Sequence, residues 1–356
     1  MTKLSVQLVT WNGSKYISYL FDSLKKQTFS DWELIILDNG SSDDTVEKIK
    51  QEIKDFPVEV EFIELKENLG FAGGHNKIVK RQMSINSKVE SKYILLLNQD
   101  MYLGQNCFEK MVEFLDAHED VAVVSPRLMK WNFEKRIDGF TNKVDSLGLK
   151  VFRNRRVIEK YTNKIWDEKK SKFELSFRTN YEAMEVFGVS ATLPMYRRRT
   201  IQAIEFSDGN FFDDSYGSYK EDVDLSFRLR SAGFSAFVLL DTVAYHDRSA
   251  VGQEHMSDSV AAKNKKTQSE WVKYHSYKNH LMTIYKNEYW QNWLLDAVFI
   301  KFYEIKKFVW FLLFDREVLK GLGEVWKMRK ELKQKRLEIK QKRTVDWREM
   351  RRWWKH

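Results

Sequence analysis

The stretch YILLLNQDMYL, from Tyr93 to Leu103, runs five nearly continuous apolar residues directly into an amide and a carboxylate. A short apolar run that ends in polar residues is typical of a buried strand. We therefore expect Asn98 and Asp100 to lie at the carboxyl end of such a strand. In open α/β sheets, ligands bind at that end.

Other segments predict more strands and helices of the same sheet. Strand composition occurs in residues 4–10, 32–38, 58–65 and 121–126, and helical periodicity occurs in residues 14–27 and 106–118. Such alternation indicates an α/β fold with a central, mainly parallel sheet. Thr10, Asn12 and Asp38 also stand at or just after strand ends, so we expect a single polar site along this edge.

Composition limits the class of protein. With 43% hydrophobic residues among 356, the chain can bury a sizeable core in one large domain or two smaller ones. Its single cysteine, Cys107, excludes an internal disulfide and a cysteine-based zinc site. The first residues lack the charged leader and apolar stretch of a secretion signal. We therefore predict a cytoplasmic protein.

The positive charge is concentrated at one terminus. Residues 327–355 contain 13 Lys or Arg and 4 Asp or Glu, which accounts for the net charge of +9 of the whole chain. The rest of the chain is close to neutral. This distribution argues against a core that binds nucleic acid and indicates a basic appendage on a neutral domain.

Asp100 and His246 each have two interpretations. Asp100 could be an ordinary turn residue. It could also bind a Mg²⁺ or Mn²⁺ ion that bridges a diphosphate, because a carboxylate at the rim of a parallel sheet suits such an ion. His246 follows the apolar segment VLLDTVAY and is compatible with a buried structural histidine or with a metal ligand.

Two further motifs could contribute to a site. Glu221, Asp222 and Asp224 begin a helical segment. The helix macrodipole accounts for one or two of these acids and leaves a third for proton transfer. The glycine-rich stretch 68–76 would let a ligand approach the backbone, but taken alone it is better explained by a plain loop. It is neither G-x-G-x-x-G nor a P-loop, so it predicts no dinucleotide site.

Taken together, six pieces of the sequence resemble the inverting glycosyltransferase family 2 with its GT-A fold, and within it the bacterial rhamnosyltransferase-like branch. The pieces follow the family order over about residues 4 to 250 and are LVTWNG, LIILDNGSSDDT, ENLGFAGGHN, YILLLNQDMYL, EDVDLSFRLRSAGF and VAYHDRSA. Each piece is weak alone, whereas the set is specific.

The resemblance implies a role for each matched residue. On the donor side it implies that base and ribose contact Thr10, Asn12 and Asp38, and that the nucleotide pocket is lined by Gly70, Phe71, Gly73, Asn76 and Asn98. It also implies that Asp100 binds the metal, with His246 near the metal and the diphosphate. Asp222 corresponds to the general base, and Glu221 and Asp224 are assigned to the acceptor side.

Two departures from the family pattern affect these assignments. Asn98-Gln99-Asp100 replaces the Asp-x-Asp motif, so one carboxylate is missing. Residues 201–222 replace the usual segment before the base, which leaves the acceptor side less defined than the donor side.

The implied reaction transfers a sugar with inversion from a nucleotide-diphosphate sugar to a saccharide or lipid-linked saccharide, in the synthesis of a bacterial surface polysaccharide such as O-antigen. The branch favours dTDP-rhamnose as the donor and Mg²⁺ or Mn²⁺ as the cofactor. UDP-hexoses are the alternative donors. A membrane-associated scaffold that binds nucleotide without catalysis is the alternative function.

The domain organisation follows from these patterns. Residues 1–255 are predicted to form the catalytic domain, with a nucleotide-sugar half at 1–126, an insertion or lid at 131–172 and an acceptor half at 180–255.

Residues 270–356 are predicted to be helical, aromatic and basic, and to bind the inner face of the cytoplasmic membrane peripherally. The apolar run at 308–314 is too short to span a bilayer. A packed helix with a solvated charged extension is the alternative.

Overall fold

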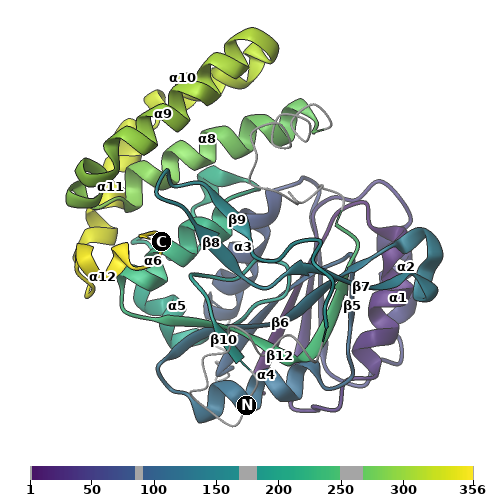
Figure 1. The fold of residues 1–356 in the computed structure, drawn as a ribbon. Coiled ribbons are helices and arrows are strands. Elements are labelled where there is room, and N and C mark those ends of the chain that lie inside the picture. The colour runs from purple at the N-terminus through teal and green to yellow at the C-terminus, as the bar shows by residue number, and fades with distance from the viewer. Residues whose placement is uncertain (1, 85–90, 168–182, 249–267, 356) are drawn as a thin grey trace.

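The computed structural model describes residues 2–84, 91–167, 183–248 and 268–355. A central sheet carries helices on both faces, and the C-terminal helices lie together on one side, next to β8 and β9 in the view of Figure 1. The strands are β1 Leu4–Thr10, β2 Trp32–Asp38, β3 Val60–Glu64, β4 Tyr93–Asn98, β5 Met101–Leu103, β6 Val121–Trp131, β7 Phe140–Ser146, β8 Leu149–Val151, β9 Val157–Glu159, β10 Ala183–Glu185, β11 Met195–Arg197 and β12 Ser235–His246. The helices are α1 Ser14–Lys25, α2 Thr45–Glu52, α3 Gly70–Ser84, α4 Cys107–Ala117, α5 Arg198–Ile204, α6 Glu221–Ser231, α8 Glu270–Asn287, α9 Trp290–Phe314, α10 Lys320–Lys327, α11 Arg329–Gln341 and α12 Trp347–Arg351.

The sheet has the predicted α/β character but is mixed. Its strands run in the order β10-β12-β6-β11-β4-β1-β2-β3, with β5 paired to β12 and β7 paired to β6. Strands β4, β1, β2 and β3 are parallel, whereas β11 is antiparallel to both of its neighbours, β4 and β6. The carboxyl ends of β1, β2 and β4 therefore meet at one edge, as the sequence predicts.

The core explains why these segments form strands and helices. Every residue of β4 from Tyr93 to Leu97 is buried, which accounts for its continuous apolar run. Helix α1 buries Ile17, Leu20, Phe21 and Leu24 on the single face that its periodicity predicts.

Strand β6 extends beyond the predicted end at Pro126. It continues to Trp131 because Pro126 lies at an irregular point of the pairing with β12, where the register shifts between Leu239 and Val243. A proline is tolerated at such a bulge because no ladder donor is required there.

The segment predicted as an insertion or lid, residues 131–172, is part of the sheet over residues 140–146. Its strand β7 pairs with β6, and Val144 is buried. Strands β8 and β9 form a separate hairpin. Residues 168–172 lie outside the described part of the chain.

Buried ion pairs attach the C-terminal helices to the sheet domain. The ammonium of Lys286 on α8, with no exposed surface, lies 2.5 Å from Asp213 and 3.0 Å from Asp224. On α9, buried Asp296 pairs with Arg155 at 3.2 Å and with Arg351 at 2.7 Å. The C-terminal region therefore packs as a continuation of the fold.

The basic tail is not a free, solvated extension. Lys335 lies 2.7 Å from Asp213, and Arg343 donates a hydrogen bond to the carbonyl of Asn287. These charges hold α11 and the following loop against the domain, so only the remaining basic residues of the tail face solvent.

Helix α9 leaves one long face uncovered. The exposed large apolar side chains on it are Trp290, Trp293, Leu294, Leu295, Val298, Phe299, Phe302, Ile305, Phe308, Val309, Leu312, Leu313 and Phe314. Among the described residues, no helix is long and apolar enough to cross a membrane. We call this set the α9 apolar face.

We predict that Lys286→Met lowers the free energy of unfolding by roughly 3–5 kcal/mol, because it leaves two buried carboxylates, Asp213 and Asp224, without their shared cation. Urea unfolding followed by circular dichroism measures the change. The matched control is Lys50→Met, since Lys50 forms an exposed pair with Glu64, and its effect should be far smaller. Equal effects of both substitutions would contradict this account.

Candidate active site

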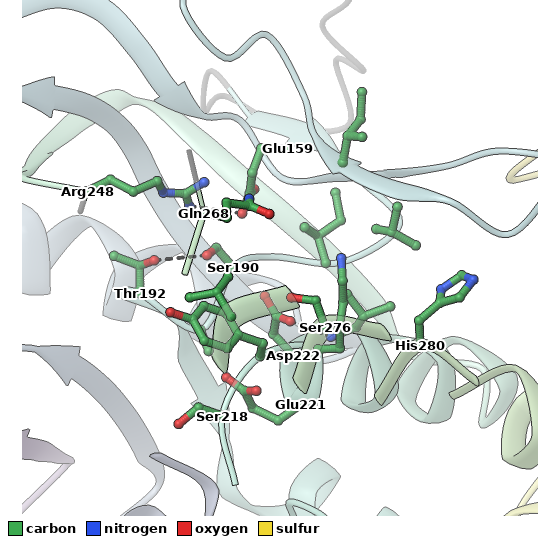
Figure 2. Close-up of a pocket in the computed structure, with 18 of the residues that line it drawn as sticks. Glu159, Ser190, Thr192, Ser218, Glu221, Asp222, Arg248, Gln268, Ser276 and His280 are labelled. Carbon is green, nitrogen blue, oxygen red and sulfur yellow. Dashed lines mark hydrogen bonds and ion pairs between the residues drawn. The ribbon is translucent and has the colours of Figure 1, made fainter. Parts of the chain in front are cut away.

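A cavity of about 510 Å³ lies between the sheet edge and the C-terminal helices. Each surrounding element contributes side chains to its wall. These include Asn98 and Asp100 after β4, Glu159 on β9, Ser190 and Thr192 before β11, Glu221 and Asp222 on α6, His246 on β12, and Ser276 and His280 on α8. Figure 2 shows Asp222, Glu159, Arg248 and Ser190 around this space.

Strand pairing brings the predicted base-and-ribose residues together. Thr10 and Asp38 are direct partners in the register of β1 and β2, and the Thr10 hydroxyl donates to the Asp38 carboxylate at 2.9 Å. Asp38 also accepts the backbone N–H of Ser41 at 2.8 Å. Asn12, with a positive φ of 48°, accepts the N–H of Ser42 at 2.8 Å. The three residues shape a common pair of loops; their contact with a nucleotide remains a prediction.

The residues of the glycine-rich stretch, which were predicted to line the nucleotide pocket, differ in what they contact. Phe71 lines the cavity. Gly70 has φ +72°, and a Cβ there would lie 2.7 Å from the carbonyl oxygen of Gly217, so this glycine permits two loops to touch. At Gly73 a Cβ would meet the Cβ of Leu69 at 3.0 Å.

Asn76 lies apart from the cavity wall. It is buried, and its side-chain amide exchanges hydrogen bonds of 2.9 and 3.1 Å with the backbone of Phe212. It holds the loop before α6, so its predicted contact with the nucleotide stays untested.

Asp100 and His246 meet at the cavity wall. The imidazole Nε2 lies 3.3 Å from the Asp100 carboxylate, and Nδ1 lies 2.9 Å from the buried carboxylate of Asp145. Burial alone would lower the pKa of His246, but the two neighbouring carboxylates raise it to about 9. Without a metal ion, the His246 ring therefore carries a proton at neutral pH and pairs with Asp100. A divalent cation would displace this proton, because only the neutral imidazole is a metal ligand.

These residues fit a divalent cation. Mg²⁺ and Mn²⁺ accept carboxylate and imidazole ligands and leave other positions to substrate phosphates. A carboxylate on the far nitrogen of a ligating histidine is the usual second contact, and Asp145 provides it. The described residues contain no cluster of three or more such side chains, so an ion here would depend on ligands from the substrate as well.

Asp222 and Glu221 begin α6 and also line the cavity. Burial and nearby Glu159 together raise the pKa of Asp222 to about 6, against the opposing effect of Lys220. Burial and the neighbouring Asp222 also raise the pKa of Glu221, and its Oε2 atom is buried without a hydrogen-bond partner. One turn of helix therefore presents two carboxyl groups that hold protons more tightly than usual.

Asp224, predicted on the acceptor side, points elsewhere. It has no exposed surface and pairs with Arg228 at 3.0 Å and with Lys286. Two residues along a helix rotate a side chain to a different face, so Asp224 belongs to the packing of α8 rather than to the cavity.

Sequence reasoning missed three side chains of the site. Glu159 lies 3.0 Å from Arg248, which lies 3.4 Å from Asp145. Asp145 and Glu159 come from the segment whose weak periodicity predicted a lid. For Arg248, the only signal in the sequence was its position two residues after His246. Ser249 and Ala250, the end of that motif, lie outside the described residues.

The comparisons with known proteins show the family of this chain. The model of the family "Glycosyl transferase family 2" matches residues 5–204, and the chain belongs to this family. The poly(ribitol-phosphate) beta-N-acetylglucosaminyltransferase TarS of Staphylococcus aureus is 28% identical over 127 residues, which cover 35% of this chain and 21% of that protein. The matched segments make up 13 to 21% of the first curated relatives.

Solved structures establish the fold. The structure of S. aureus TarS 1-349 in complex with UDP-GlcNAc aligns with a TM-score of 0.53 and 16% identity over 96% of this chain and 89% of that one. GalNAc-T7 with UDP, GalNAc and Mn²⁺ aligns with a TM-score of 0.56 and 12% identity over 82% of this chain and 49% of that one. The predicted GT-A fold is thus confirmed. The relatives do not favour a rhamnosyltransferase branch, because their names refer to teichoic acid and other polymers.

We predict that Asp100→Ala weakens Mn²⁺-dependent binding of UDP by about tenfold or more, because it removes one of two protein ligands for the ion. Calorimetric titration of UDP with and without Mn²⁺ measures this. Asp247→Asn is the matched control, since the Asp247 carboxylate accepts from Tyr16 at 2.6 Å and lies outside the cavity wall. Metal dependence that is the same in wild type and Asp100→Ala would refute the assignment.

Proposed function

We propose that this chain transfers a sugar, with inversion at the anomeric carbon, from a nucleotide-diphosphate sugar to a hydroxyl of a cell-surface polymer or its precursor. The observation that carries the proposal is that Asp222, Asp100 and His246 line the same cavity. A base and a cation site in one cavity suit displacement of a diphosphate by an acceptor oxygen.

Asp222 acts as the general base. Its carboxylate accepts the proton of the acceptor hydroxyl while the oxygen attacks the anomeric carbon from the face opposite the diphosphate. The bond between that carbon and the phosphate oxygen breaks, and its electron pair leaves with the nucleoside diphosphate. A pKa raised toward neutrality strengthens the base without keeping it protonated at neutral pH.

Other residues of the chain prepare this step. Asp145 holds Nδ1 of His246 and so orients the ring toward Asp100. A Mg²⁺ or Mn²⁺ ion held by Asp100 and His246 supplies charge neutralisation for the leaving diphosphate when bound. Glu221, whose raised pKa keeps it protonated near neutral pH, can donate a hydrogen bond to the acceptor.

For the donor, we place UDP-sugars first. The support is the UDP-GlcNAc complex of TarS, although its identity of 16% to this chain limits it to fold-level analogy. The dTDP-rhamnose favoured by the sequence motifs remains a candidate, because Thr10 and Asp38 can contact either pyrimidine nucleotide. A donor panel decides between them.

We also propose that the α9 apolar face rests on the surface of the cytoplasmic membrane. The support is that the opposite side of α9 lines the cavity through Tyr303, Lys307 and Phe311, so one helix connects the apolar face to the site. Exposed Lys301 lies on the same helix, as expected for contact with anionic lipid. This position would bring a lipid-linked acceptor to the cavity.

We predict that Asp222→Asn lowers sugar transfer by about 10²–10⁴-fold while UDP binding stays near the wild-type value, because the amide cannot accept the proton. Release of UDP from a panel of nucleotide sugars measures turnover, and calorimetry measures binding. The matched control is Asp214→Asn, a residue outside the cavity wall. Near-normal transfer by Asp222→Asn would overturn the proposed base.

We predict that Phe302→Ser and Leu313→Ser, at positions 69% and 65% exposed, each weaken binding to anionic phospholipid vesicles by roughly tenfold, since each removes a large apolar contact. Vesicle flotation measures the bound fraction. Leu337→Ser, exposed on α11, is the control. If the wild-type chain ignores vesicles and instead self-associates through this face, the membrane proposal fails.

A further inference from the structure

The cavity continues beyond Asp222 toward the C-terminal helices. Its far end is lined by Lys273, Tyr277 and His280 from α8, by Tyr303 and Lys307 from α9, and by Arg156 and Lys220 from the loops before β9 and α6. Lys220 and the residues of α8 and α9 lie outside the span that the family model matches. Arg156 lies within that span, so the far end combines one residue of the matched region with residues that follow it.

Three cations in the wall have counter-ions in the protein. Lys273 lies 3.1 Å from Asp315, Lys307 lies 3.3 Å from Glu304, and Arg248 is paired with Glu159. Their charges are balanced before any ligand binds. They can shape the cavity, but they offer little net attraction for an anion.

Arg156 and Lys220 differ from these three. Nη2 of Arg156 is buried without a hydrogen-bond partner. In the described part of the chain, neither side chain has a carboxylate within ion-pair distance. Burial lowers the pKa of Lys220, the carboxylates of Asp222, Glu159 and Glu221 raise it, and nearby Arg156 lowers it. These carboxylates offset part of the charge from a distance, but none forms an ion pair with either head group, so the unpaired Arg156 Nη2 and the Lys220 ammonium are left for a ligand to contact.

Their position assigns this anion to the acceptor. The donor diphosphate belongs at Asp100 and His246, at the sheet edge. Lys220 lies toward α8 instead, since it also borders a small hollow with His280 and Thr283. Aromatic rings of Tyr277 and Tyr303 near the same end can stack on a sugar or polyol.

We propose that the acceptor carries a phosphate group close to the hydroxyl that reacts, and that Arg156 and Lys220 bind this phosphate. The inference rests on the proposed function and specifies the substrate class of its acceptor site. Arginine and lysine beside each other suit a phosphate, because arginine supplies a planar pair of donors and lysine a compact charge.

Two acceptors share this chemistry. A polyol phosphate polymer carries a phosphodiester next to each free hydroxyl, and a lipid-linked saccharide carries a diphosphate at its first sugar. The name of the relative TarS refers to a poly(ribitol-phosphate) acceptor. The experiment therefore includes one probe of each kind and one uncharged probe.

Calorimetry of the full chain, saturated with UDP and Mn²⁺, tests the proposal. The probes are tri(glycerol phosphate), a farnesyl diphosphate-linked N-acetylglucosamine, and uncharged triglycerol. We expect one phosphate probe to bind at least tenfold more tightly than triglycerol. Arg156→Gln and Lys220→Gln should each weaken that binding by about tenfold, and Lys220→Arg should retain most of it.

Lys150→Gln is the matched control. It removes an equal charge, and Lys150 is exposed on β8 of the β8–β9 hairpin, whose connecting loop contains Arg156. UDP binding in every variant reports on folding and on the donor end. Equal binding of phosphate and uncharged probes, or variants that bind like wild type, would overturn the inference and leave the transferase proposal intact. Loss of UDP binding in Lys220→Gln would assign the pair to the donor and also refute it. Failure of the wild-type chain to bind either UDP or dTDP would refute the proposed function itself.

Discussion

The parallel pairing of β1, β2 and β4 is the constraint on which the site depends. Their register sets Thr10 beside Asp38, and it ends β4 where Asn98 and Asp100 enter the cavity. Burying a polar group without a partner is costly. Thr10 and Asp38 bind each other, and Asp100 pairs with His246 at the cavity wall.

Away from the sheet edge, buried ion pairs hold the C-terminal helices in place. Lys286 is shared between Asp213 and Asp224, and Asp296 between Arg155 and Arg351. These pairs fix α8 and α9 against the catalytic domain. One side of α9 then lines the cavity, and the α9 apolar face lies outside. The sheet edge, the cavity and the apolar face are thus connected through these packed helices.

Local sequence patterns predicted the features that are determined by local structure, such as strand bounds and the residues at strand ends. The bounds of β1 and β2 matched the apolar runs, and strand or helix ends indicated Asp100, Asp222 and His246. Asp145 and Glu159 could not be found this way, because β7 and the β8–β9 hairpin bring them in through irregular, long-range pairing. The pairing of Asp224 with Arg228 and Lys286 could not be read from the sequence for a similar reason, since the packing of α8 decides which acid of the first helical turn lines the cavity. Charge counting along the tail likewise could not show that some of its cations, such as Lys335 and Arg343, contact Asp213 and Asn287.

The most direct test of the account is the stereochemistry of transfer. The wild-type chain, with Mn²⁺, a UDP-α-sugar and a phosphate-bearing acceptor, should release UDP and give a product whose new linkage is β by proton NMR. A single displacement with Asp222 as base requires this inversion. An α-linked product would contradict the mechanism, and the absence of UDP release from every nucleotide sugar tried would contradict the assignment of the cavity as a transferase site.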